Sequence, residues 1–119
     1  MKFSIRDREF EIALHDTPTA AALSDALPIE ATANRWGDEI YCLTDVQLPE
    51  EPEAREVMGV GEIAYWPPQA GIALFFGPTP ASTDERPRAY SRCNVFGTFE
   101  VDLDFLRSVR DGEPIRVFA

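Results

Sequence analysis

The sequence has little of what nucleic-acid binding and membrane attachment require. It has only 11 basic residues against 21 acidic ones, so its formal net charge is −10 at pH 7. Because phosphate recognition depends largely on Lys and Arg, this charge argues against nucleic acids and anionic membranes as partners. No apolar run approaches the roughly 18 residues of a membrane-spanning helix. The N-terminus becomes charged too early for a signal peptide, and we therefore expect a cytoplasmic protein.

Residues and motifs typical of well-known active sites are also scarce. There is no Gly-x-Ser-x-Gly nucleophile elbow and no Gly-rich Walker phosphate loop. The single histidine, His15, lies beside Asp16 and just before a helix-capping Thr17, where a surface or capping role is favoured over catalysis. Metal-ligating residues do not cluster at ligand spacings. The sequence thus predicts neither a metal nor a cofactor.

The chain contains only two cysteines, Cys42 and Cys93, far apart in sequence and each in an apolar setting. Buried free thiols in a reducing compartment are the favoured interpretation. A disulfide between them stays open, because distance along the chain does not exclude proximity in space.

Short apolar segments separated by turn residues are what the sequence has in abundance. The 119 residues predict one domain, 1–119, and 45% hydrophobic residues are ordinary for a globular protein. Thr17 before Pro18 predicts the start of a short helix, and Asp102 predicts the start of a second. Alternating apolar residues predict a hairpin over 3–14, and further strands are expected near 29–33, 39–43, 63–66, 72–76, 94–101 and 115–118. This pattern favours a mainly β sandwich or barrel of about eight strands.

The densest segment runs from Gly61 to Pro80. It contains two apolar runs bounded by Gly and Pro, the residues that separate strands rather than helices. It also holds Trp66, the only Phe-Phe pair and four of the ten prolines. We interpret it as two central strands with rigid turns.

Several motifs, in order along nearly the whole chain, resemble a family of small prokaryotic cyclophilin-like proteins catalogued mainly as a domain of unknown function. The resemblance implies a closed cyclophilin-like β-barrel of eight strands capped by two helices. Closure would remove the exposed strand edges that favour aggregation. The motifs are Leu27–Ile29, Trp36–Tyr41, Gly61–Pro67, Phe75–Pro80 and Asn94–Gly97.

The resemblance also suggests prolyl isomerase activity. Cyclophilins hold a substrate proline in an apolar pocket, where an arginine weakens the resonance of its amide bond. Phe75-Phe76 resembles the Phe-Phe strand of that pocket. The Phe-His-Arg motif that supplies the arginine is absent, however, because the comparable strand reads Glu-Ile-Tyr-Cys-Leu over residues 39–43. An isomerase would need a different arginine, with Arg35 or Arg92 as candidates.

Acidic and aromatic residues adjoin one another at two places, and two interpretations remain open. Asp38, Glu39 and Glu62 neighbour Trp36, Tyr41, Tyr65 and Trp66. If they converge, a carboxylate in an aromatic pocket could bind a cation or accept a proton. In the alternative, Glu39 and Glu62 face water while the aromatic residues pack inward.

Three arginines, Arg86, Arg88 and Arg92, surround Tyr90 in an otherwise acidic chain. They could form a site for an anion, since arginine binds carboxylates through two hydrogen bonds. A solvated edge strand with surface ion pairs is the favoured alternative.

We therefore expect a binding module with an aromatic-lined cleft for a small metabolite or an extended, proline-containing peptide. Pro78–Pro80 could shape the mouth of the cleft. The alternatives are a weak prolyl isomerase and a unit for protein interaction or homo-oligomerisation. The candidate ligand-binding residues are Tyr41, Glu62, Trp66, Phe75, Phe76, Thr79 and Arg92.

Overall fold

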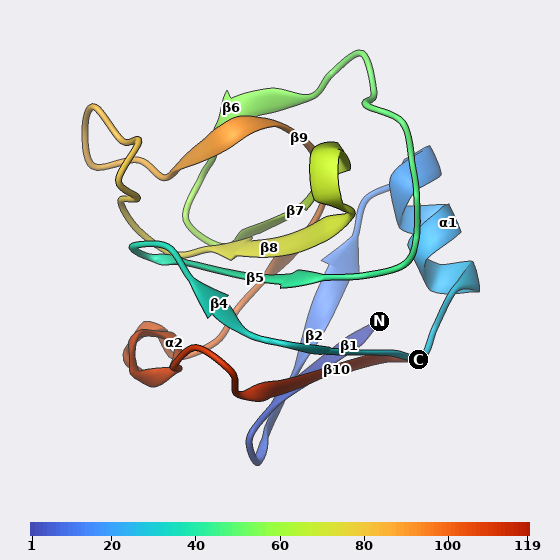
Figure 1. The fold of residues 1–119 in the computed structure, drawn as a ribbon, viewed down its shortest axis with the longest axis horizontal. Coiled ribbons are helices and arrows are strands. Elements are labelled where there is room, and N and C mark those ends of the chain that lie inside the picture. The colour runs from blue at the N-terminus through green and yellow to red at the C-terminus, as the bar shows by residue number, and fades with distance from the viewer.

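Short strands make up 44% of the chain, and the computed structural model describes residues 1–119. Figure 1 shows the strands wrapped around a common interior, with the two α-helices on opposite sides. The helical segments are α1 (Pro18–Asp25), the single-turn η1 (Pro67–Gln69) and α2 (Leu103–Ser108). The strands are β1 (Lys2–Ile5), β2 (Arg8–Leu14), β3 (Ile29–Thr32), β4 (Asn34–Arg35), β5 (Glu39–Leu43), β6 (Arg55–Val57), β7 (Glu62–Trp66), β8 (Gly71–Phe75), β9 (Arg88–Phe99) and β10 (Pro114–Phe118).

The local signals in the sequence correspond to the observed elements. β1 and β2 form the expected hairpin, in which Phe3 is opposite Phe10. The side chain of Thr17 accepts a hydrogen bond from the amide of Ala20 at the start of α1. Asp102 caps α2 in the same way. These caps satisfy backbone amides that have no partner within the helix.

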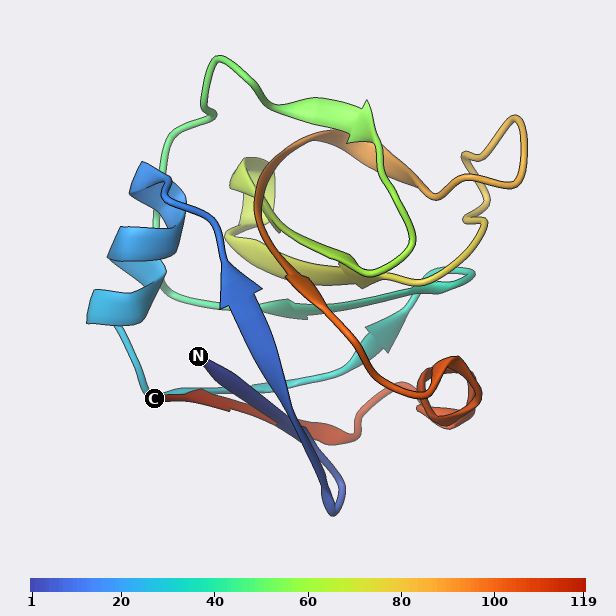
Figure 2. The same ribbon diagram turned by 180° about the vertical axis from the view of Figure 1, so that it is seen from behind.

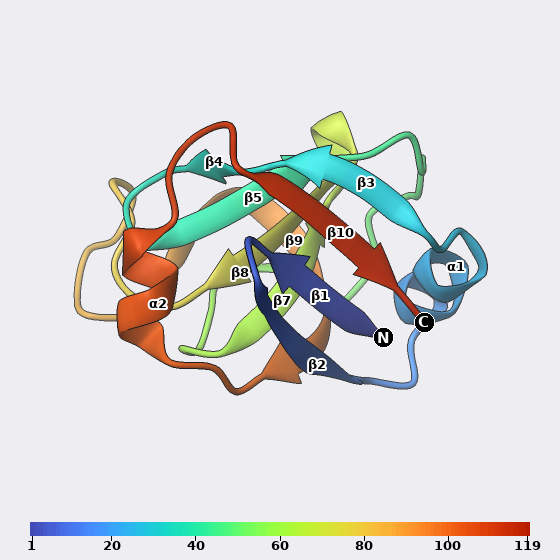
Figure 3. The same cartoon turned by 90° about the horizontal axis from the view of Figure 1, so that it is seen from below.

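The strands follow one hydrogen-bonded path, in the order β3-β10-β1-β2-β9-β7-β8-β5-β4, and β6 pairs with β9 beside it. Figure 3 shows β3, β10, β1 and β2 side by side on one surface, with the two chain termini close together. The path ends in β3 and β4, which are consecutive in the chain and separated only by Ala33. It is not closed by hydrogen bonds, so a mainly β fold is confirmed and a closed barrel is not.

The structure has ten strands rather than about eight, because β4 and β6 are too short to produce an apolar pattern. β9 is also longer than the strand expected from Asn94, since it already begins at Arg88. Figure 2 shows β9 curving from β6 past β7 toward β2 before the chain enters α2. One strand therefore borders two different parts of the sheet. None of the helices has the length and hydrophobicity of a membrane-spanning segment.

The interior consists of two separate hydrophobic clusters. The larger one contains 22 buried residues contributed by most strands and both helices. The smaller one contains six: Met58, Ala64, Ala73, Phe75, Ala89 and Cys93. All five residues of β8 are buried, because one face of the strand contacts the large cluster and the other contacts the small one. The candidate functional site lies over the small cluster.

Candidate functional site

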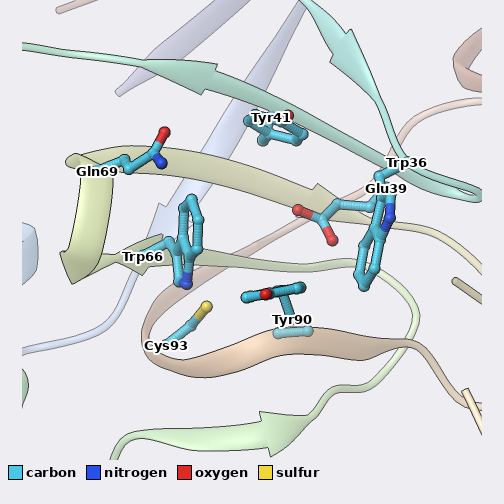
Figure 4. A pocket seen from close by; sticks show the side chains of 8 residues that line it. Trp36, Glu39, Tyr41, Trp66, Gln69, Tyr90 and Cys93 are labelled. Carbon is cyan, nitrogen blue, oxygen red and sulfur yellow. The ribbon is translucent and has the colours of Figure 1, made fainter. Parts of the chain in front are cut away.

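A cavity of about 240 Å³ lies over the small hydrophobic cluster, between β5 and the first half of β9. Its walls come from segments far apart in the chain: the turn after β4, β5, the end of β7, η1 and β9. Figure 4 shows the side chains around it. They belong to Trp36, Glu39, Tyr41, Trp66, Gln69, Ala89, Tyr90 and Cys93.

The alternation of β5 explains why a polar residue enters this apolar site. Ile40 and Cys42 lie in the large cluster, so the residues between and before them, Tyr41 and Glu39, face the opposite side of the sheet. There Glu39 is opposite Phe75 on β8. Because residues in register share a face, Phe75 lies next to Glu39 beneath the cavity.

A tight turn after β4 positions Trp36 at one wall. Gly37 has a φ of +62°, and a Cβ there would lie 2.9 Å from both Thr79 Cα and Pro80 Cδ. A larger residue would therefore clash with backbone as well as strain the turn. The amide of Trp36 also donates to the carbonyl of Glu39 at 3.0 Å. The motifs 36–41 and 75–80 thus pack against each other as one unit.

Four aromatic rings surround the cavity. Trp36 and Trp66 stand on opposite sides, and Tyr41 and Tyr90 border the remaining two (Figure 4). The ring centre of Tyr90 lies 6.1 Å from that of Trp36 and 6.0 Å from that of Trp66, both in edge-to-face geometry. Trp66 is fixed further, since its Nε1 donates to Ser91 Oγ at 2.6 Å. Tyr90 is 74% exposed and therefore stands at the mouth of the cavity.

Glu39 is the unusual residue of this site. It is only 8% exposed, and its carboxylate points into the space between the rings (Figure 4). Its Oε1 is the one buried side-chain oxygen or nitrogen without a hydrogen-bond partner. Burial raises the pKa of Glu39 to about 8. The carboxyl group can therefore change its charge near neutral pH.

The thiol of Cys93 lines the wall nearest β9 but is not an activated nucleophile. Burial raises its pKa to about 12, and the nearby charges of Glu39 and Glu50 act in the same direction. A neutral thiol is a weak nucleophile. Cys42 lies in the large cluster, and burial raises its pKa to about 12 as well. Both cysteines are free, which agrees with the favoured sequence interpretation.

Three of the predicted ligand-binding residues gather at this site, and Phe76 does not. Tyr41 and Trp66 line the cavity, and Phe75 lies in the small cluster beneath it. Phe76 instead lies in the large cluster, where the guanidinium carbon of Arg35 is 5.4 Å from its ring centroid. Adjacent residues point to opposite faces, which accounts for the separation of Phe75 and Phe76.

The other three predicted residues lie outside the cavity and have partners of their own. Glu62 forms an ion pair with Arg55 at 2.6 Å and accepts a hydrogen bond from the amide of Gly59. The hydroxyl of Thr79 donates to a backbone carbonyl and organises the loop after β8. Arg92 donates through Nε to the carbonyl of Ala54, in the segment between β5 and β6. Of the three acids suggested for an aromatic pocket, Asp38, Glu39 and Glu62, only Glu39 lines the cavity.

No motif in the sequence directly indicates the wall formed by β9, which contributes Ala89, Tyr90 and Cys93. An indirect signal was the uninterrupted apolar run at residues 71–76. Such a run is typical of a strand covered on both faces, so a further element had to cover the second face. Without the register, that element could not be identified as β9.

The arginines near Tyr90 have surface partners. Arg86 pairs with Asp84 at 2.7 Å, and Arg88 pairs with Glu56 at 3.4 Å. These contacts agree with a solvated strand carrying ion pairs rather than with an anion site. No group of three or more His, Cys, Asp or Glu is placed to hold a metal ion.

Comparison with known proteins places these features in a family. The family model described as "Cyclophilin-like" matches residues 1–118. The solution structure of the hypothetical protein AF2241 from Archaeoglobus fulgidus is 40% identical in sequence, with a TM-score of 0.82. That match covers 98% of this chain and 91% of the other. Among curated proteins, none matches the chain.

Proposed function

This chain belongs to the cyclophilin-like family, and we propose that it is a binding module for a small molecule held in the aromatic cavity. The main support is a single observation. The one buried side-chain oxygen or nitrogen without a hydrogen-bond partner, Glu39 Oε1, belongs to a carboxylate that points into a cavity lined by four aromatic rings. A fold alone does not define a function, so the proposal rests on this site.

The composition of the cavity supports binding. Ligand sites combine apolar and aromatic walls with few polar groups that fix the orientation of the ligand. Here six of the eight lining residues are hydrophobic, and Glu39 and Gln69 supply the polar groups. A buried polar group without a partner costs roughly 1–3 kcal/mol, and a ligand that satisfies Glu39 would recover part of this cost. At about 240 Å³ the site suits a small molecule.

No arginine lines the cavity, so nothing there favours the isomerase alternative. Of the two arginines suggested for that activity, Arg35 donates to the carbonyls of Arg107 and Val109 at the end of α2. Arg92 donates to the carbonyls of Pro52 and Ala54. Both guanidinium groups thus have structural partners away from Glu39.

A thermal-shift screen of small metabolites against the wild-type protein and a Tyr90→Ala variant tests the proposal. Because Tyr90 is mostly exposed, its removal should leave the fold intact while opening the mouth of the cavity. We expect some ligands to raise the melting temperature of the wild type and to have a smaller effect on the variant. Phe118→Ala, at an aromatic residue in β10 outside the cavity, is the matched control. If no class of small molecule shifts the wild type, the proposal is wrong.

A further inference from the structure

We propose that the ligand of this cavity is an organic cation, whose ammonium group lies against the carboxylate of Glu39 and the faces of the surrounding aromatic rings. This inference rests on the proposed binding function and specifies the chemistry of the ligand. Its basis is the arrangement in Figure 4, where the carboxylate enters the space between two indole rings and two phenol rings.

Both kinds of wall favour positive charge. The face of an aromatic ring carries partial negative charge and attracts cations, most strongly at tryptophan. When ionised, the carboxylate of Glu39 adds a formal negative charge, and it takes part in no ion pair within the chain. No Lys, Arg or His lines the cavity. An anionic ligand would therefore meet repulsion, and a purely apolar ligand would leave Oε1 unsatisfied.

The cation must be organic rather than metallic. A metal ion needs several oxygen, nitrogen or sulfur ligands, and Glu39 is the only carboxylate in the cavity. The thiol of Cys93 stays protonated because its pKa is about 12. An alkylammonium group, in contrast, needs one counter-charge and apolar surface for its carbon atoms. The cavity provides this combination.

None of the titratable or charged groups near Glu39 pairs with its carboxylate, which is therefore free to interact with a ligand. The titratable groups facing it are Tyr41 of β5 and Tyr90 and Cys93 of β9. β8, which pairs with β5, contributes no titratable residue. β4, on the other side of β5, contributes Arg35, whose guanidinium donates to the carbonyl of Gly37 and to carbonyls of α2.

Cation binding should therefore depend on pH in a defined direction. The pKa of Glu39 is about 8 in the empty site, so the carboxyl is mostly neutral at pH 7. A cation prefers the ionised form and lowers this pKa, so that binding releases a proton. Below pH 8 the affinity should decrease by about tenfold for each pH unit. A neutral ligand with a carbonyl acceptor would show the opposite dependence, because it would need the protonated acid.

Calorimetric titration with choline tests the inference, because its charge does not change with pH. The neutral comparison compound is its carbon isostere, in which a tert-butyl group replaces the trimethylammonium group. We expect choline to bind at least tenfold more tightly than the isostere at about pH 9, and to lose most of this affinity at about pH 6. The butylammonium ion, compared with butanol, tests whether a primary ammonium group is accepted.

Three variants locate the effect. Glu39→Gln keeps the size of the side chain and should abolish both the preference for the cation and its pH dependence. Glu100→Gln removes the same charge from an exposed residue without hydrogen bonds or ion pairs and should leave binding unchanged. Tyr90→Ala, at the exposed mouth, should weaken choline binding severalfold and provides a test independent of Glu39.

The outcomes separate this inference from the function on which it rests. Equal binding of choline and its isostere, or tighter binding at low pH, would show a binding site that is not selective for cations. The cation proposal would then be wrong while the binding function stands. If neither these compounds nor any member of the metabolite screen binds, the binding function itself fails. Loss of binding in Glu100→Gln to the same extent as in Glu39→Gln would attribute the effect to overall charge and overturn the proposed site.

Discussion

Glu39 and Glu62 occupy equivalent positions on the two strands that flank β8, yet their environments are opposite. Both are opposite Phe75, one from β5 and the other from β7. Burial acts to raise the pKa of Glu62, but hydrogen bonds from Arg55 and the amide of Gly59 outweigh it, and the pKa is lowered. At Glu39 no such partner exists, and burial alone raises the pKa to about 8.

One of these two similar acids therefore has a structural role, and the other is available to a ligand. Glu62 joins β7 to Arg55 of β6 and to the turn at Gly59. It is a structural residue whose charge is already neutralised. Glu39 stabilises nothing that the structure shows, and its charge is left for something that enters the cavity. Four substitutions test this contrast.

The largest effect on stability is expected at Phe75, the residue that both acids flank. Its side chain is fully buried in the small cluster, so Phe75→Ala removes a ring and leaves a void. Such changes typically cost about 3–5 kcal/mol. Denaturant unfolding should show this loss, whereas Phe118→Ala should cost far less. A small loss at Phe75 would mean that the small cluster contributes little to the fold.

The next largest effect is expected for Glu39→Gln, which should stabilise the folded protein at high pH. An acid whose pKa rises from 4.5 when unfolded to about 8 when folded holds its proton longer in the folded state. The free energy of unfolding therefore decreases as pH rises between these two values, by about 1 kcal/mol per pH unit. Glu39→Gln removes this dependence. At about pH 9 it should be more stable than the wild type, and at about pH 4 the difference should vanish.

Unfolding curves of both proteins across this pH range measure the difference directly. Glu100→Gln serves as the control for a general change in charge, and it should follow the wild type at every pH. Parallel curves for wild type and Glu39→Gln would show that Glu39 is paired or hydrated in solution, and would remove the contrast with Glu62.

A change of opposite sign is expected at Glu62. Glu62→Gln should destabilise the protein near neutral pH, because Arg55 loses its charged partner. Arg55 is well exposed, so the cost should be only about 1 kcal/mol. The sign can be checked in the pH series already described. Because the pKa of Glu62 is lowered on folding, the stabilisation is present above its unfolded pKa and should disappear as pH falls through its folded pKa.

The contrast between the two acids shows where sequence reasoning succeeds and where it fails. Hairpins, capped helices and the strands around Trp66 and Phe75 follow from local patterns, because turns and caps depend on neighbouring residues. The sequence also placed Glu39 and Glu62 beside aromatic residues. It could not distinguish the two acids, because the environment of Glu62 depends on Arg55 and that of Glu39 depends on Tyr90. Arg55 and Tyr90 are positioned only by the pairing of β6 with β9.

For a similar reason, the sequence could not separate Phe75 from Phe76, and both were candidates for the site. Both are buried aromatic residues in the same motif, and a shift of one residue exchanges the two faces of a strand. Only the register of β8 against β5 assigns Phe75 to the side of the cavity. Local pattern therefore predicted the elements of this fold well, while the composition of the site required the strand pairing.

The smallest effect on stability is expected at Tyr90, and it separates binding from folding most clearly. The residue is 74% exposed and contacts Trp36 and Trp66 through ring edges. Tyr90→Ala should therefore change the unfolding free energy by about 0.5 kcal/mol or less, while weakening choline binding severalfold because one face of the cation is no longer covered. Tyr90→Phe should keep both stability and affinity, since it preserves the ring. If Tyr90→Ala bound choline as tightly as the wild type, the exposed ring would not be part of the site, and recognition of the cation would rest on Glu39 and the three inner rings of Trp36, Tyr41 and Trp66.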